Sequence, residues 1–143
     1  MKTIYFIFVV IFTTLFSCTK TLESLCPCGK VEINKKEYIA MCIIPNIISE
    51  NSVNKLIIEN YTKKGLVYDP PFSIEYFNGN QWETLEFDFG FTLPAYTLHA
   101  GKLIEWEINL YSLVERYNDG KKGKYRYVKN VCRYNLYAEF EIK

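Results

Sequence analysis

Five cysteines and one histidine carry most of the intrinsic reactivity of this 143-residue chain. Four cysteines follow the first: Cys26, Cys28, Cys42 and Cys132. An even number of thiols in an exported protein favours disulfides, and four cysteines allow three connectivities that a sequence does not choose among. Cys-Pro-Cys is not the C-x-x-C spacing of a redox pair or a metal clip. We therefore expect possible structural disulfides or unpaired thiols at these positions, with redox or metal chemistry as the alternative.

The other polar side chains do not form a catalytic set. His99 precedes the turn Ala100-Gly101, and no serine, cysteine or aspartate is spaced to complete a triad with it. The acids of the central segment alternate along expected strands, where they normally face water and protect an edge; they are Glu83, Glu86, Asp88, Glu105 and Glu107. Residues 120–124 lack the spacing of a phosphate-binding loop. We expect a non-enzymatic protein with no catalytic residue, no metal site and no cofactor.

Aromatic and basic residues suggest a possible binding surface instead. The chain has 12 tyrosines and 10 phenylalanines, and several tyrosines fall at strand ends or loops. Exposed aromatic rings stack on sugars or bind proteins. The possible binding surface consists of Tyr68, Tyr96, Tyr117, Lys121, Lys122 and Lys124. Its partner would be an unknown protein or glycan, and Arg126, Lys129 and Arg133 would extend the lysines into a modest basic cluster suited to an acidic polysaccharide or lipid headgroup.

The first residues predict export and membrane anchoring. Lys2 precedes an apolar run over residues 4–16, which is long enough for a signal peptide and too short to span a bilayer. Ser17-Cys18 then resembles the bacterial lipoprotein signal, in which the cysteine becomes the lipidated N-terminus after cleavage. This resemblance implies a diacylglyceryl thioether and an acyl chain such as palmitate on Cys18. The alternatives are an ordinary secretory peptide and a buried N-terminal strand.

The lipid and the charge balance together predict where the protein is found. Two or three acyl chains anchor a domain firmly to a membrane, whereas one chain binds marginally. The expected location is the bacterial cell envelope, extracytoplasmic, at the outer membrane. Because the chain has 17 basic and 16 acidic residues, the sequence gives no electrostatic case for nucleic acid binding.

The elements that would position these residues are strands. Hydrophobic alternation with intervening turns predicts about seven short strands after residue 30, the number typical of an immunoglobulin-like antiparallel β-sandwich. The expected segments are 31–40, an edge strand broken at Pro45, 53–61, a hairpin of 72–76 with 81–87 around Asn78-Gly79, 104–110, and a hairpin of 125–131 with 136–142. Residues 112–116 could form one helical turn. The chain is expected to comprise a signal peptide (1–17), a lipidated tether (18–30) and one sandwich domain (31–143).

Several short motifs, in order, carry a family resemblance over about residues 53–143. They are Asp69-Pro70-Pro71-Phe72-Ser73-Ile74-Glu75, Asn78-Gly79, Trp82, Leu98, Gly101, 105–110 and 123–129. The chain resembles bacterial immunoglobulin-like domains of small Bacteroidetes-type lipoproteins. The resemblance implies the sandwich fold and an envelope location, and it implies no reaction. It also implies that Tyr125 forms a tyrosine corner with the preceding loop. The cysteine bridge of antibody cores is missing, so Trp82 must pack without it.

Two functional hypotheses follow. The first is a lipid-anchored binding or structural module that contacts its partner through loops or an exposed edge strand. The second is a protease-inhibitor-like sandwich that presents residues 65–71 or 118–124 to a protease.

Overall fold

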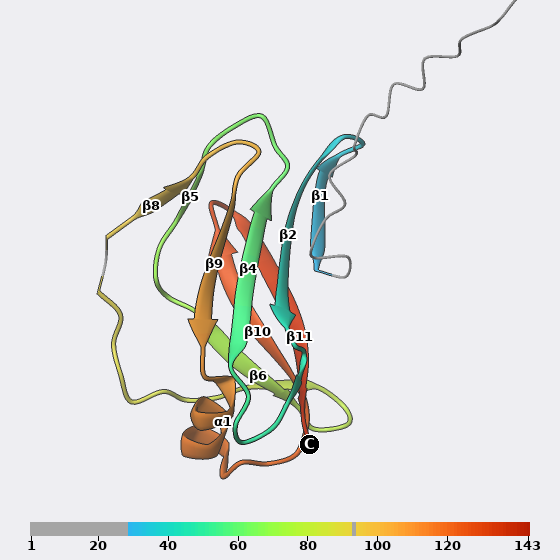
Figure 1. The fold of residues 1–143 in the computed structure, drawn as a ribbon, viewed down its shortest axis with the longest axis vertical. Helices are drawn as coiled ribbons and strands as arrows, with labels where there is room; N and C mark the ends of the chain where they lie inside the picture. Colours follow the sequence, from blue (N-terminus) through green and yellow to red (C-terminus); the bar gives the residue numbers. More distant parts are fainter. Residues whose placement is uncertain (1–28, 93) are drawn as a thin grey trace, which may run out of the picture.

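The computed structural model describes residues 29–92 and 94–143, and these form a two-layered β-structure with one helix (Figure 1). The elements in chain order are β1 (Lys30–Asn34), β2 (Glu37–Ile44), β3 (Ile47–Ile48), β4 (Asn54–Asn60), β5 (Leu66–Tyr68), β6 (Ser73–Phe77), β7 (Trp82–Thr84), β8 (Tyr96–Leu98), β9 (Leu103–Ile108), α1 (Leu110–Asn118), β10 (Gly123–Val131) and β11 (Tyr134–Ile142). The prediction of a mostly β, two-sheet sandwich is confirmed.

The two sheets divide the strands unequally. The first sheet has the order β1-β2-β4-β9, and all its neighbours pair antiparallel. The second has the order β3-β11-β10-β5-β8, with β6 pairing β10 and β7 pairing β6. β10 pairs β11 over its whole length and lies between β11 on one side and β5 and β6 on the other. β9 and β8 therefore each end their sheet on the same side of the molecule (Figure 1).

The core lies between the sheets and follows the predicted alternation. In the final hairpin, inward-pointing side chains are buried in the core; they are Tyr125, Tyr127, Val131, Leu136 and Phe140. They meet a row from β2 and β4 that includes Ile39, Met41, Ile43, Leu56 and Ile58. Burial of such side chains contributes about 1.5–3 kcal/mol each, so this contact holds the two sheets together.

The strand count differs from the expectation because turns divide two predicted segments. Residues 31–40 form a hairpin rather than one strand, since the Asn34 side chain accepts hydrogen bonds from the backbone N–H groups of Lys36 and Glu37 at 2.9 and 3.1 Å. β2 ends at Ile44, directly before Pro45, and the short β3 then pairs β11 in parallel.

The helix is longer than the single predicted turn. β9 ends at Ile108, and Asn109 caps α1 by accepting a hydrogen bond of 2.9 Å from the backbone N–H of Ser112. Leu110 and Val114 bury one face of the helix against the core. α1 ends at Asn118, and the following residue, Asp119, caps it with a left-handed backbone at φ = 51°. Within residues 29–92 and 94–143, no helix has the length and apolar character needed to cross a membrane.

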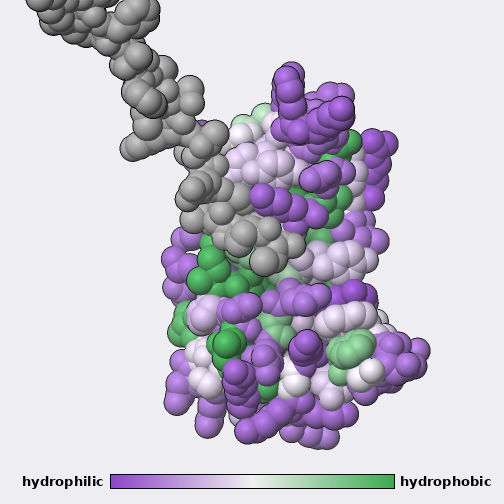
Figure 2. All heavy atoms as spheres, turned by 90° about the vertical axis from the view of Figure 1, so that its right-hand side faces the viewer, coloured by the Kyte–Doolittle hydropathy of each residue, from purple (hydrophilic) through white to green (hydrophobic). Residues whose placement is uncertain are grey.

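The side of the molecule opposite β8 and β9 carries mixed surface chemistry. Figure 2 faces this side and shows groups of hydrophobic residues interrupted by hydrophilic ones. Exposed Ile44 and Ile47 belong to the adjoining β2 and β3 segment. Outside the grey atoms, this view shows no continuous apolar surface.

Candidate functional site

A cleft of about 490 Å³ opens where β9 of one sheet faces β5 and β8 of the other. We call it the edge cleft. Both sheets and the segment after β5 line it, through Leu56, Tyr68, Pro70, Phe72, Tyr96, Trp106, Glu107, Ile108, Tyr127 and Lys129. Its size lies within the range of small-ligand pockets, and its lining is mainly apolar and aromatic, as is typical of binding sites.

Three aromatic side chains form the mouth of the edge cleft. The rings of Tyr68 and Tyr96 are stacked with centroids 5.6 Å apart, and Trp106 meets Tyr68 edge to face at 6.0 Å. Tyr96 remains 48% exposed and Trp106 remains 37% exposed. Burial, and to a lesser degree the neighbouring Tyr96, raises the pKa of Tyr68 above its ordinary value. These rings therefore form a preassembled, partly solvent-exposed aromatic surface that bridges the two sheets.

Lys129 forms part of the wall of the edge cleft and is only 3% exposed. Its ammonium donates hydrogen bonds to the backbone carbonyls of Asp69, Pro70 and Pro71 at 2.5, 3.3 and 3.2 Å. An ammonium has three donors, so all of them are used here. Burial lowers the pKa of Lys129, and the Asp69 carboxylate opposes that shift. Lys129 thus fixes the segment that leads from β5 to β6 and has no donor left for an anionic ligand.

β9 forms the lip of the edge cleft on the other sheet. Trp106 pairs with buried Leu56 across the sheet and shares its inward face, whereas Glu105 and Glu107 point to the outer face. Lys55 bonds Glu105 at 3.2 Å. Glu107 makes no ion pair with another described residue.

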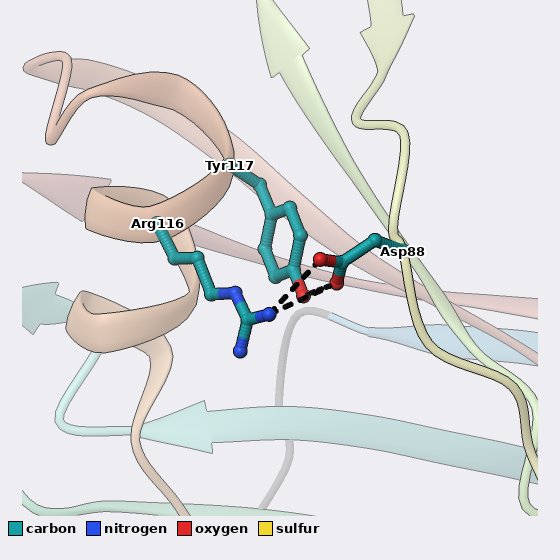
Figure 3. Close-up of polar contacts among 3 residues, drawn as sticks. All are labelled: Asp88, Arg116 and Tyr117. Atoms are coloured by element: carbon teal, nitrogen blue, oxygen red, sulfur yellow. Dashed lines mark hydrogen bonds and ion pairs between the residues drawn. The ribbon is translucent and has the colours of Figure 1, made fainter.

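A second aromatic group lies where the segment after β7 meets α1. Arg116 and Tyr117 of α1 both reach the Asp88 carboxylate (Figure 3). The hydrogen bond from Tyr117 lowers the pKa of Asp88, with Arg116 contributing in the same direction. Burial, followed by this hydrogen bond, raises the pKa of Tyr117. The ring of Tyr117 also packs edge to face on Phe87 at 4.9 Å. The group fastens the segment to the helix and uses its polar atoms internally.

The structure divides the possible binding surface that the sequence predicts. Tyr68 and Tyr96 meet in the edge cleft, whereas Tyr117 belongs to the α1 group. Lys121 lies over the ring of Tyr76 at 4.3 Å, and its lysine neighbours are exposed at the start of β10; these are Lys122 and Lys124. The six residues therefore do not form one surface.

The basic cluster expected from the same region does not extend to Lys129, and Arg126 is engaged by neighbouring side chains. Successive side chains of β10 alternate between its two faces. Arg126 therefore lies on the outer face and Lys129 lies in the interior. Arg126 stacks between the rings of Trp82 and Tyr137, at 4.4 and 4.5 Å, and pairs with Glu75. Trp82 accordingly packs on the outside of the second sheet rather than in the core.

The tyrosine corner expected at Tyr125 is confirmed. The Tyr125 hydroxyl donates to the backbone carbonyl of Lys121 at 2.5 Å and accepts from the Asn118 side-chain amide at 2.8 Å. These bonds join the end of α1 to the start of β10. The loop 118–124 is thereby held close to the sheet.

The two cysteines that the structure describes do not line the edge cleft. Cys42 is disulfide-bonded, and Cys132 is an exposed free cysteine, so these two are not joined to each other. Cys132 accepts a hydrogen bond from the backbone N–H of Val67 at 3.1 Å. The lipidation prediction at Cys18 and the possible disulfides at Cys26 and Cys28 lie outside the described residues.

The described part of the chain contains no assembled site for acid–base or metal chemistry. His99 is exposed in its turn, as expected, and its carbonyl accepts from the buried amide of Asn60 at 3.2 Å. No group of three or more histidine, cysteine, aspartate or glutamate side chains is placed to hold a metal among residues 29–92 and 94–143. The arrangement of the edge cleft suits noncovalent binding.

Sequence reasoning missed Trp106 and Lys129 as parts of the site. Alternation placed Trp106 on the buried face of a half-buried strand. It stays exposed because β9 ends its sheet and the short β8 does not cover it. The alternating row Tyr125, Tyr127, Lys129, Val131 did contain the signal that Lys129 points inward.

Comparison with known proteins identifies the domain type. A family model described as a bacterial Ig-like domain matches residues 36–141. No curated protein matches the chain significantly. Among solved structures, the chain is similar to Pseudomonas fluorescens alkylpurine DNA glycosylase AlkC bound to DNA containing an abasic site analogue, with 18% identity and a TM-score of 0.45. The match covers 77% of this chain and 31% of the glycosylase chain.

Proposed function

We propose a non-catalytic binding role at the bacterial envelope for this chain, which belongs to the bacterial Ig-like domain family. The family match accounts for the immunoglobulin-like sandwich and indicates a surface or structural module. The finer proposal is that a lipid on Cys18 tethers the domain and that the edge cleft binds the partner.

The observation that carries the binding role is the exposed aromatic mouth of the edge cleft. Tyr96 and Trp106 are large aromatic residues that keep 48% and 37% of their surface exposed, and exposed aromatic rings that lie together mark a binding surface. Both occur in a cavity that Lys129 and its three carbonyl contacts keep in shape. A preformed aromatic cavity loses little conformational entropy when a ligand binds, which favours affinity.

The inhibitor alternative gains no support from the loops it requires. Residues 66–68 form β5, which pairs β8, and the following carbonyls are held by Lys129. The loop 118–124 is held by the tyrosine corner. A protease-binding loop normally projects from its scaffold, and neither segment is free to do so.

Photo-crosslinking in the native cell tests the binding role. Benzoylphenylalanine at position 96 lies in the edge cleft, and the same residue at position 137 is the matched control, because Tyr137 is also an exposed tyrosine, 40% accessible, but on the outer face of β11. We expect one discrete crosslinked species from position 96 that position 137 does not give. Equal crosslinking from both positions, or none from position 96, would contradict the proposal.

Mass spectrometry of the mature N-terminus tests the anchor separately. We expect a chain that begins at Cys18 and carries acyl chains, and a Cys18→Ala variant that leaves the membrane fraction. An unmodified Cys18 would remove the anchor while leaving the binding role of the edge cleft to its own test.

A further inference from the structure

We propose that β9 binds an extended segment of a partner protein as an added antiparallel strand, with a bulky apolar side chain in the edge cleft and a lysine or arginine beside Glu107. This rests on the binding role proposed above and specifies the chemistry of the ligand. It makes the outer edge of β9, rather than a loop, the contact surface.

The backbone of β9 is available for such pairing. Among the described residues β9 pairs with β4 alone, so its second row of N–H and C=O groups faces outward. Its register with β4 runs without a shift from Leu103 to Ile108. Natural edge strands are blunted by proline, bulges, shortness or charge; β9 has no proline or bulge, and its charged side chains, Glu105 and Glu107, are both acidic. Six regular residues provide an edge of about 20 Å.

The alternation of β9 decides where the side chains of an added strand would go. Directly opposed residues of an antiparallel pair project from the same face of the sheet. A residue opposite Trp106 would therefore point between the sheets, into the edge cleft beside Tyr68 and Tyr96. The cavity of about 490 Å³ has room for a leucine, methionine or aromatic side chain. Its neighbours in the peptide would point to the outer face.

Charge on the outer face selects those neighbours. Lys55 lies directly opposite Glu107 in the register of β4 and β9 but bonds Glu105, so Glu107 makes no ion pair with a described residue. A lysine or arginine opposite Glu107 would form a cross-strand ion pair, which stabilises antiparallel strands by roughly 0.2–1 kcal/mol. The expected peptide therefore has a basic residue next to the residue that enters the cleft.

The same charges disfavour a second copy of this chain as the occupant. Two β9 strands paired by a two-fold axis keep outer faces together, so the central registers place Glu105 opposite Glu105, Glu105 opposite Glu107, or Glu107 opposite Glu107. Like charges directly opposite each other destabilise the pair. β9 is thus protected against self-pairing while it stays open to a basic partner strand.

A glycan fits the edge cleft less well than a peptide. Sugar recognition needs several free hydrogen-bonding groups around the stacking ring. In the cleft Lys129 has spent all three donors on backbone carbonyls, and Tyr68 is stacked on Tyr96. The outer edge of β9 adds a row of N–H and C=O groups that pair with no described strand, and an extended peptide reaches that row in register.

Selection from a displayed library of random peptides of about nine residues, enough to span β9, tests the proposed chemistry. We expect selected peptides to share a bulky apolar residue flanked by lysine or arginine. Glu107→Lys should weaken their binding by about fivefold and shift a new selection toward aspartate or glutamate. Glu50→Lys makes the same charge change in the turn before β4 and should alter neither. No enrichment, or enrichment unaffected by Glu107→Lys, would overturn the proposal.

Backbone methylation of a selected peptide tests strand addition without altering the protein. Methyl groups on every second amide block the edge that faces β9, and methyl groups on the alternate amides block only the solvent edge. We expect one methylated peptide to bind more than about tenfold more weakly and the other to bind as the parent does. Equal effects of the two patterns would rule out strand addition.

The two proposals fail separately. If a glycan array binds with dependence on Trp106 and no peptide is selected, the peptide inference is overturned and the binding role of the edge cleft stands. If position 96 gives no specific crosslink in the cell and neither peptide nor glycan binds, both are overturned.

Discussion

Replacing Tyr125 by phenylalanine isolates the contribution of the tyrosine corner. The ring is fully buried and stays in place, so Tyr125→Phe creates no cavity and removes only the hydroxyl. That hydroxyl makes two hydrogen bonds, at 2.5 Å to the Lys121 carbonyl and at 2.8 Å to the Asn118 amide. Each contributes about 1 kcal/mol net, so the free energy of unfolding should fall by about 2 kcal/mol.

Urea denaturation followed by circular dichroism measures this change, and thermal melting should show a drop of roughly 5–10 °C. Tyr137→Phe is the control, because the Tyr137 hydroxyl makes no hydrogen bond among the described residues and the side chain is exposed. Its effect should stay within about 0.5 kcal/mol. If the two variants are equally stable, the corner does not hold α1 to β10 as argued.

Three further predictions address the wall of the edge cleft, two tyrosines whose pKa values are raised, and the residue before β1. Lys129→Met should lower the free energy of unfolding by about 1–3 kcal/mol, because three carbonyl acceptors lose their donor; an unchanged or higher urea midpoint would mean that relief of charge burial outweighs those bonds. Burial raises the pKa of Tyr61 from 10.0 to about 12 and also raises that of Tyr127, so the folded chain keeps protons that the unfolded chain loses, and stability should fall as pH rises above about 10. Tyr61→Phe should make that decline shallower in urea titrations across this range, and an identical slope would refute the assignment. Gly29→Ala should destabilise by more than about 2 kcal/mol, because a Cβ there would lie 1.8 Å from the Met41 carbonyl oxygen, and a wild-type melting temperature would contradict this contact.

Local patterns were sufficient to predict the central and final hairpins. Asn78-Gly79 defines the first, and strict alternation from Leu136 to Ile142 defines the second, since each signal is contained within a few residues. The start of α1 was missed because Leu110 continues the alternation of β9 in sequence. Only the Asn109 cap, which bonds Ser112, separates strand from helix.

The edge cleft depends on contacts that no local pattern specifies. Tyr68, Tyr96 and Trp106 belong to three different strands, and they meet because two different sheets end on the same side. Lys129 was assigned to a surface cluster on its charge, although its position in the alternating row of β10 points it inward. Charge at a buried position needs acceptors from elsewhere in the fold, and those acceptors are backbone carbonyls that a sequence does not display.

Oxidative footprinting of intact cells measures most directly whether the edge cleft is occupied where the protein works. Trp106, Tyr96 and Tyr137 are similarly exposed in the isolated domain, at 37%, 48% and 40%, and should be modified at comparable rates after purification. In cells we predict that modification of Trp106 and Tyr96 falls severalfold while that of Tyr137 does not change. Equal rates for all three side chains in cells and in the purified protein would contradict a binding role for the cleft.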